Sequence, residues 1–161
     1  MPTEAPWIVS ARKEIGVREI HGTQNNPAIV GYWHDVHLSG VKDDETAWCA
    51  AFAGAMLERN GIASTRSGAA RSYLAWGVPL AKPEPGCIVV FSREGGGHVG
   101  FVLGRDAAGH LEVLGGNQGD SVCIAAFKTD RVAGYRWPTG VPVPTDPLPV
   151  LAATDLSRSE A

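Results

Sequence analysis

Cys49 is the side chain in this sequence best suited to nucleophilic chemistry. It opens an apolar stripe at helical spacing, made by Cys49, Phe52, Ala53, Met56 and Leu57. The capping region Glu45-Thr46 precedes it, so the thiol is expected in the first turn of a helix. There, unpaired N–H groups and the helix dipole stabilise a thiolate. A cysteine on an apolar stripe is, however, more often a small buried side chain. Cys87 and Cys123 fall in strand patterns and are expected to be buried thiols.

His98 and Asn117 supply a base and a polar partner for this thiol. Two strand-like segments, His98 to Arg105 and His110 to Gly116, flank the turn Asp106 to Gly109 and predict an antiparallel hairpin. In this register His98 lies opposite Asn117, and directly opposed side chains have Cβ atoms about 4.5–5.5 Å apart. The amide oxygen can then accept a hydrogen bond from the imidazole and fix its tautomer. Taken alone, His98 is more often structural and Asn117 a turn residue.

These three residues form a catalytic arrangement if the helix covers one particular face of the hairpin. On the face of His98 the register places three residues without side chains, Gly100, Gly104 and Gly115. Such a bare face lets another backbone approach closely. We expect the helix that contains Cys49 to pack there, which brings nucleophile, base and orienting residue together.

The elements that must position these side chains run in the order helices first, strands afterwards. Helical spacing and cap signals predict helices at 7–20, at 27–37, from near Cys49 to Asn60, and at 67–76. Short strands separated by turn residues follow at 87–92, 98–105, 110–116, 122–127 and 132–137. This order predicts an α+β fold with N-terminal helices packed on a five- to six-stranded antiparallel sheet.

Length and charge restrict the possible functions. The chain has 161 residues, enough for one domain, with 14 Lys and Arg against 17 Asp and Glu and a net charge of −3. This balance argues against a nucleic-acid partner, which favours a basic surface. The opening residues lack signal-peptide features and no apolar run reaches membrane-spanning length, so we expect a chain made in the cytoplasm with reduced thiols and no membrane insertion. Residues 1–138 are predicted to form the catalytic domain and the Pro-rich residues 139–161 a flexible tail.

Several motifs around these residues resemble those of the CHAP and NlpC/P60 cysteine peptidases. Asp44 to Phe52 is similar to the nucleophile helix of that superfamily, Gly97 to Val102 to its histidine strand, and Gly115 to Gln118 to its third-residue segment. The strand Gly86 to Phe91 and the closing segment Gly134 to Pro138 fit its small phage and bacterial subgroup.

The resemblance implies a papain-like α+β fold and a thiol hydrolase that cleaves an amide bond in the peptide stem of peptidoglycan. It assigns Cys49 as nucleophile, His98 as general base and acid, and Asn117 as orienting residue, without a cofactor. Some CHAP enzymes carry an acidic residue two positions before the Asn, but here that position is Gly115. Glu112, the nearest acid, is expected on the other face of the hairpin and outside the triad.

Substrate contacts are predicted around the same cleft. Glu19 lies in a Gly-Val-Arg-Glu-Ile-His-Gly stretch that resembles the superfamily's loop bordering the cleft. Aromatic side chains could line a groove, although they are more often core. The tentative substrate-binding residues are Glu19, Trp48, Trp76 and Gln118. The Cys49 N–H is the natural first oxyanion donor, and the second stays open among Thr46, Asp44 and Gln118.

Two clusters carry side chains of the metal-ligating type. The acidic run Asp43 to Glu45 could bind calcium, as in certain CHAP domains, but it lacks an alternating ligand pattern, and a helix-capping role is favoured. His34 and His37 stand three residues apart on a short helix with no further ligand, which favours a solvated face. We therefore predict no metal.

Together these features predict a monomeric peptidoglycan hydrolase, either an N-acetylmuramoyl-L-alanine amidase or an endopeptidase. The absence of a signal peptide and of a wall-binding repeat fits a phage or prophage endolysin that acts in the periplasm or cell wall after release by a holin. The alternatives are an interbacterial effector amidase delivered by injection, a non-catalytic wall-binding module that uses the same groove, and a thiol acyltransferase.

Overall fold

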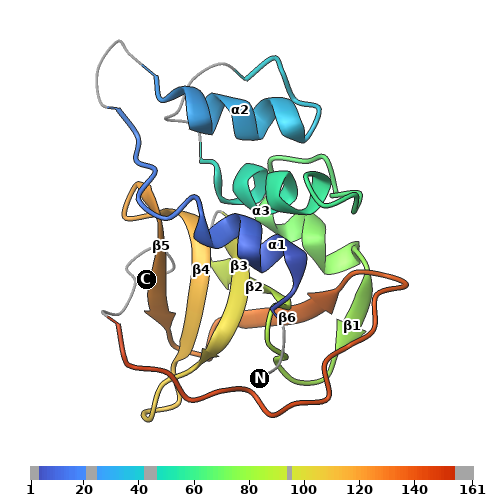
Figure 1. Ribbon diagram of the computed structural model, residues 1–161, viewed down its shortest axis with the longest axis vertical. Helices are drawn as coiled ribbons and strands as arrows, with labels where there is room; N and C mark the ends of the chain where they lie inside the picture. Colours follow the sequence, from blue (N-terminus) through green and yellow to red (C-terminus); the bar gives the residue numbers. More distant parts are fainter. Residues whose placement is uncertain (1–3, 21–24, 42–46, 94–95, 155–161) are drawn as a thin grey trace.

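Helices and strands occupy separate stretches of the chain, as the sequence pattern predicts. The computed structural model describes residues 4–20, 25–41, 47–93 and 96–154. Its helices are α1 (Pro6–Arg12), α2 (Pro27–Asp35), α3 (Cys49–Glu58) and the short 3-10 helix η1 (Ala70–Ala75). The strands are β1 (Val78–Leu80), β2 (Ile88–Arg93), β3 (Gly96–Arg105), β4 (Leu111–Gln118), β5 (Ser121–Phe127) and β6 (Val132–Trp137). They form one antiparallel sheet in the order β1-β6-β2-β3-β4-β5, which confirms the predicted α+β fold (Figure 1).

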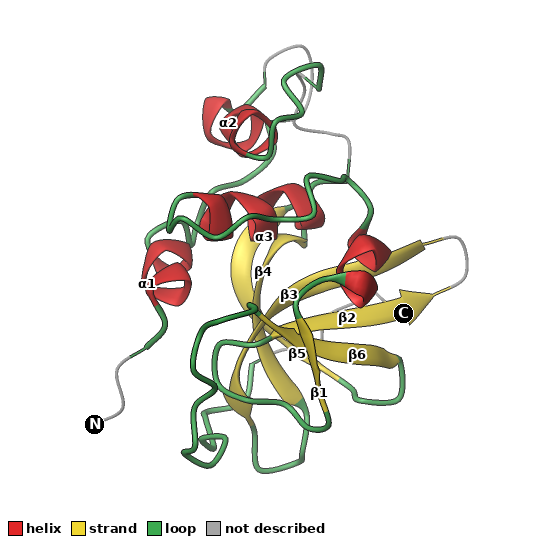
Figure 2. Cartoon of the chain, turned by 90° about the vertical axis from the view of Figure 1, so that its right-hand side faces the viewer, coloured by secondary structure: helices red, strands yellow, loops and turns green. Residues whose placement is uncertain are grey.

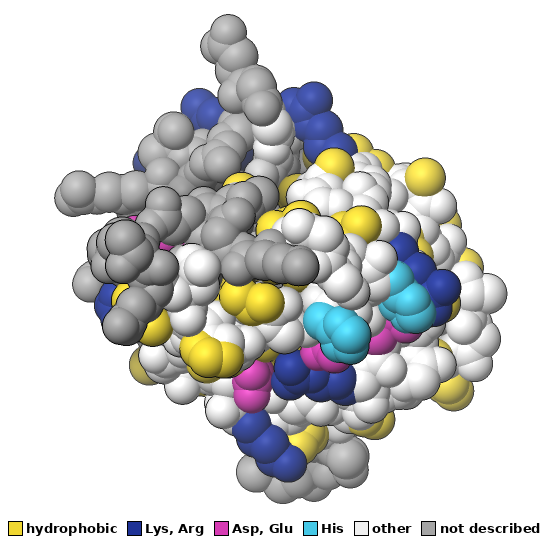
Figure 3. Space-filling view, turned by 90° about the horizontal axis from the view of Figure 1, so that it is seen from above, with side chains coloured by type: hydrophobic (Ala, Val, Ile, Leu, Met, Phe, Trp, Pro, Cys, Tyr) yellow, Lys and Arg dark blue, Asp and Glu magenta, His cyan; other side chains and the backbone are white. Residues whose placement is uncertain are grey.

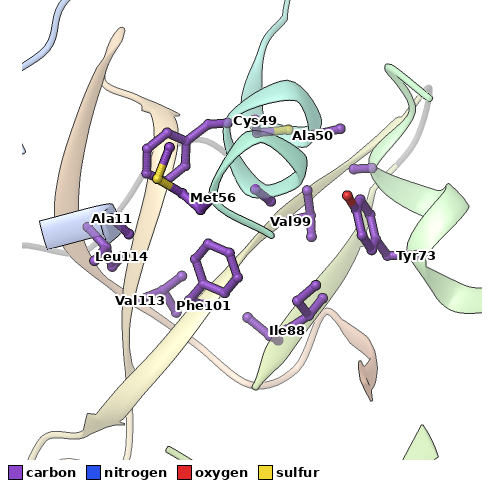
Figure 4. Close-up of a cluster of buried hydrophobic side chains, with 14 of the residues drawn as sticks. Ala11, Cys49, Ala50, Met56, Tyr73, Ile88, Val99, Phe101, Val113 and Leu114 are labelled. Carbon is purple, nitrogen blue, oxygen red and sulfur yellow. The ribbon is translucent and has the colours of Figure 1, made fainter. Parts of the chain in front are cut away.

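Helix α3 lies between α2 and the sheet (Figure 2), and this position explains its composition. Residues 49 to 57 are all buried, as a helix that is apolar on every side requires. The Phe52 ring packs edge-on against Tyr32 of α2 and Phe101 of β3, with ring centroids 5.3 and 6.5 Å away. Figure 4 shows Cys49 and Met56 in the same buried cluster as Val99 and Phe101. The nucleophile candidate is therefore carried by the most buried helix of the fold.

Two of the predicted helices are shorter than expected. Helix α1 ends at Arg12, because Gly16 adopts φ +104° and its N–H bonds to the Val122 carbonyl of β5 at 3.0 Å. The segment that follows continues along β5, so residues 16–19 flank the sheet where the pattern predicted helix. The segment predicted as a helix over 67–76 forms only the 3-10 turns of η1. None of the described helices is long and apolar enough to cross a membrane.

Helix α3 covers the face of the hairpin opposite to the one expected. A Cβ on Gly116 would lie 2.6 Å from Phe52 Cβ, so this position of β4 points at the helix. Cβ atoms on Gly100 and Gly115 would instead face the Gln118 amide oxygen, at 3.6 and 2.4 Å. The prediction that α3 packs on the face of Gly100 and Gly115 is wrong, because neighbouring strand residues face opposite sides of a sheet and Gly116 is the one that admits the helix.

Part of the predicted flexible tail packs along the β3–β4 hairpin. The Arg105 N–H donates to the Pro149 carbonyl at 2.9 Å, and the Leu151 N–H donates to the Arg105 carbonyl at 2.7 Å. A Cβ on Gly104 would lie 2.5 Å from the Pro149 carbonyl oxygen and 2.8 Å from Leu151 Cγ. The bare position at Gly104 does admit another backbone, but that backbone belongs to the tail. The Pro-rich composition gave no sign of these contacts.

Glu112 anchors the last described residue of the tail. Its side chain is fully buried and accepts hydrogen bonds from the hydroxyl and the backbone N–H of Thr154. A shift in register between Val102 and Gly104 pairs Glu112 with Gly104, whereas an unbroken hairpin would pair it with Leu103. The Glu112 carboxylate therefore binds the tail through Thr154.

Replacing Thr154 by Val removes a hydroxyl donor from a buried carboxylate. We expect Thr154→Val to lower the free energy of unfolding by about 1–3 kcal/mol, because a buried acceptor left without its partner keeps its desolvation cost. Urea denaturation measures the change. Thr145→Val, at an exposed position of the same tail, is the matched control and should change stability by less than about 0.5 kcal/mol. Equal stability of the two variants would contradict this account of the tail.

Candidate active site

Cys49 is the first residue of α3, as the sequence predicts, with Trp48 as its N-cap. The residue is only 6% exposed. Its sulfur accepts hydrogen bonds from the backbone N–H groups of Val99 and Ala50 and is hydrogen-bonded to the His98 side chain. The thiol of the helix and the imidazole of β3, 49 residues apart in the chain, therefore meet at the N-terminus of α3.

Two opposing effects set the acidity of this thiol. Burial raises the pKa of Cys49, whereas the hydrogen bond and the charge of His98 lower it. The N–H groups of Val99 and Ala50 lower it further, and the net pKa falls below the ordinary value of a thiol. For Cys87, burial dominates and raises the pKa to about 12. Backbone N–H groups lower the pKa of both thiols, and the two buried cysteines differ because Cys49 has His98 beside it whereas Cys87 has the like charge of Glu84.

The paired part of β3 and β4 ends close to the Cys49 sulfur. The pairs Phe101–Leu114 and Val102–Val113 confirm the register predicted from the turn. In the described part of the chain, this ladder begins at Phe101 on β3, so Val99 lies beyond it. The Val99 N–H bonds to the Cys49 sulfur there.

A bulge in β4 shifts the side chain that faces His98. Gly115 pairs with Cys123 and Gln118 pairs with Ser121, so two residues of β4 stand opposite the single residue Val122. Asn117, in the bulge, has φ +59°. The extra residue brings Gln118 onto the face of Gly115, which an unbroken strand would have given to Asn117.

The residue bonded to His98 is accordingly Gln118, with 3.0 Å between His98 Nε2 and Gln118 Oε1. The predicted pairing of His98 with Asn117 is corrected by one position. Sequence reasoning had Gln118 only as a substrate or oxyanion contact. The sequence does contain one indication of the bulge, the run Gly115-Gly116-Asn117. Asn is among the few non-glycine residues that tolerate positive φ in irregular backbone.

Two backbone carbonyls fix the orientation of the Gln118 amide. Its Nε2 donates to the carbonyls of Cys123 at 2.8 Å and Val113 at 3.2 Å. The amide oxygen must then be the atom that faces His98, and it can only accept. His98 Nε2 therefore carries a proton, which leaves Nδ1 as the nitrogen available to Cys49.

Aromatic rings hold the imidazole from the side. The His98 ring is 3% exposed and stacks on Phe127 at 5.3 Å and on Phe91 at 6.2 Å between centroids. Phe91 and Phe127 stack on each other at 4.6 Å. The ring thus has a fixed plane as well as a fixed tautomer, as a general base requires.

The predicted substrate contacts fall into two groups. Trp48 is fully buried and donates its indole N–H to Glu19 Oε1 at 2.7 Å. Gln118 is 2% exposed, and both ends of its amide are hydrogen-bonded within the protein. Neither side chain therefore presents a free surface to a substrate. Because its Nε2 bonds to carbonyls, Gln118 is not the second oxyanion donor.

The other two predicted contacts, Glu19 and Trp76, are partly exposed. Glu19 is half-buried beside Trp48. Trp76 is also half-buried and is held at the end of η1 by a bond to the Ala63 carbonyl and by the Tyr73 ring. Substrate contact by these two stays a prediction.

Other predicted positions bear on metals and the oxyanion. Asp44, Thr46 and the acidic run Asp43 to Glu45 lie outside the described residues. His34 and His37 are exposed, and His34 Nδ1 is 3.2 Å from the Ser39 hydroxyl. Figure 3 shows histidine side chains lying among acidic and basic ones on the surface seen from above. Within the described ranges, no three His, Cys, Asp or Glu side chains are grouped to hold a metal ion.

The segment that contains Cys49 and His98 matches a known family. The family model of the CHAP domain matches residues 41–117, which include Cys49 and His98. The chain therefore contains a CHAP domain, of the CHAP and NlpC/P60-like superfamily, as the motifs implied. CHAP domains are generally hydrolytic amidases or peptidases, and this match indicates a hydrolase that acts on peptidoglycan. A search of curated proteins finds no match.

The lowered pKa of Cys49 predicts selective alkylation. Alkylation requires the thiolate, which forms above the thiol pKa, so the midpoint of the rate against pH should lie below the ordinary thiol value of about 8.5. We expect His98→Ala to raise this midpoint, because burial then acts with less opposition. Iodoacetamide labelling of the folded protein, followed by peptide mass spectrometry, measures both. Labelling of Cys87 before Cys49, or a midpoint unchanged in His98→Ala, would contradict the assignment.

Proposed function

We propose that this chain hydrolyses an amide bond in the peptide part of peptidoglycan with Cys49 as nucleophile, His98 as base and acid, and Gln118 as orienting residue. The observation that carries the proposal is the buried thiol at a helix N-terminus, hydrogen-bonded to an imidazole whose other nitrogen is held by a fixed amide. The CHAP match supplies the class of substrate.

The first half of the reaction transfers the acyl group to sulfur. The Cys49 thiolate attacks the amide carbonyl carbon, and the carbonyl electron pair moves onto oxygen. The Cys49 backbone N–H lies at the start of α3, where helical N–H groups lack an internal partner, and can donate to this oxyanion. Protonated His98 gives its Nδ1 proton to the leaving nitrogen, the C–N bond breaks, and a thioester remains.

The second half returns the enzyme to its starting state. Neutral His98 takes a proton from water through Nδ1, and the resulting hydroxide attacks the thioester carbon. The C–S bond breaks, the Cys49 thiolate leaves, and the product is a carboxylic acid. Gln118 stays bonded to the Nε2 proton throughout, so the imidazole changes its charge without changing its orientation.

The biological setting that we propose is that of a phage endolysin, which reaches the wall after a holin opens the membrane. The same bond cleavage would serve an injected interbacterial effector. An assay on purified peptidoglycan tests the chemistry independently of the route by which the protein reaches the wall.

Incubation with purified peptidoglycan should release new chain ends, which mass spectrometry identifies. New lactyl ends on muramic acid define an amidase, and new peptide ends define an endopeptidase. Cys49→Ser should lower turnover by at least about a thousandfold, because the thiolate is the attacking group. Cys87→Ala, which removes another buried thiol, is the matched control and should keep its activity. An unchanged release of ends by Cys49→Ser, or no new ends from a protein whose Cys49 is reactive, would refute the proposal.

Neighbouring positions on β4 test the identity of the orienting residue. Gln118→Ala should lower kcat by at least about tenfold, because the buried imidazole loses the oxygen that accepts a hydrogen bond from its Nε2 proton. Asn117→Gly suits the positive φ of the bulge, removes the other amide side chain, and should retain kcat within about threefold. The kinetics of peptidoglycan release measure both. If Asn117→Gly is the more damaging change, Asn117 is the orienting residue after all.

A further inference from the structure

Glu19 contacts both halves of the candidate active site. Its carboxylate accepts the indole N–H of Trp48, the residue before the nucleophile, at 2.7 Å. Its backbone N–H donates to the Asp120 carbonyl, two residues beyond Gln118, at 2.9 Å. The residue thus joins the helix that carries the thiol to the turn that carries the histidine's partner.

The enclosed ring of Trp48 links the position of Glu19 to that of the adjacent Cys49. The side chain is fully buried, and its ring lies 6.0 Å from that of Tyr32 on α2. On the other side, a Cβ on Gly116 would lie 2.7 Å from Trp48 Cζ3. A ring held between α2 and β4 cannot shift without moving the adjacent Cys49 backbone.

The backbone of Glu19 is fixed just as firmly to the other half. Residues 16–19 run along the start of β5, with bonds from Gly16 N–H to the Val122 carbonyl at 3.0 Å and from Val122 N–H to the Val17 carbonyl at 2.8 Å. Arg18 and Ser121 form an antiparallel bridge beside them. Since Ser121 also pairs with Gln118, the segment that carries Glu19 is continuous with the β4–β5 turn.

We infer that Glu19 is a positioning residue that sets the distance between the Cys49 thiol and the His98–Gln118 pair, and that it is not a substrate ligand. The inference rests on the proposed roles of Cys49 and His98. A carboxylate suits the task because hydrogen bonds to an ionised acceptor are roughly twice as strong as neutral ones. Glu19 therefore tightens the contact on which the thiolate depends.

Three single variants and one double variant test the role of this hydrogen bond. Glu19→Ala should lower kcat by about tenfold or more with KM changed by less than about twofold, because misplacing reacting groups costs rate rather than binding. The midpoint of Cys49 alkylation against pH should rise in the same variant. Trp48→Phe removes the donor and should reproduce both effects, and the double variant should be no worse than either single one. Glu19→Gln keeps an acceptor oxygen and should restore most of the activity.

Glu14→Ala is the matched structural control. Glu14 accepts a hydrogen bond from the Tyr32 hydroxyl at 2.8 Å, so this variant also breaks a carboxylate–aromatic bond between the N-terminal segment and α2. It should lower Tm without moving the Cys49 alkylation midpoint. Circular dichroism confirms that each variant is folded.

Three results would overturn the inference. A rise in KM with kcat unchanged in Glu19→Ala would make Glu19 a substrate contact. An alkylation midpoint that stays in place while Tm falls, as in Glu14→Ala, would make its role merely structural. Failure of Glu19→Gln to restore the midpoint would exclude the hydrogen bond as the cause. Because alkylation needs no substrate, these readings stay decisive even if peptidoglycan proves not to be cleaved.

Discussion

The anchored amide of Gln118 is the interaction on which the rest of the candidate site depends. Its nitrogen bonds to the carbonyls of Cys123 and Val113, so its oxygen has one remaining direction, toward His98. The imidazole then keeps a proton on Nε2 and offers Nδ1 to Cys49. A thiol that burial alone would make inert becomes more acidic than usual, because this oriented base stands beside it.

The pairing of the strands is irregular around this arrangement. The ladder between β3 and β4 reaches only to Phe101 on the β3 side, and the bulge at Gly116 and Asn117 turns β4. Val99 lies beyond the end of this ladder, and its N–H donates a hydrogen bond to the Cys49 sulfur. Bulges concentrate near active sites because they redirect one side chain at small cost to the sheet. The regular parts of the fold, above all α3 with its covered apolar surface, hold this irregular part in place.

Sequence reasoning predicted the elements and the contact between Cys49 and His98, but not their fine geometry. The apolar stripe located the helix that begins at Cys49, and the turn before His110 established the register of Phe101 against Leu114. Alternation of side chains along a regular strand then predicted that Asn117 faces His98. The bulge adds one residue to β4, and simple alternation does not predict where a bulge occurs. The side of the sheet covered by α3, the burial of Trp48 and the docking of the tail on Gly104 depend on contacts between distant segments, which local patterns do not encode.

The tautomer of His98 tests this account most directly, since everything else follows from it. Nitrogen-15 NMR of Cys49→Ser, in which the ion pair with the thiolate is absent, reports which ring nitrogen of the neutral imidazole is protonated. The account predicts a proton on Nε2 that is lost from this position, or exchanges far faster, in Gln118→Ala. A neutral ring protonated on Nδ1, or an Nε2 proton indifferent to Gln118, would contradict it.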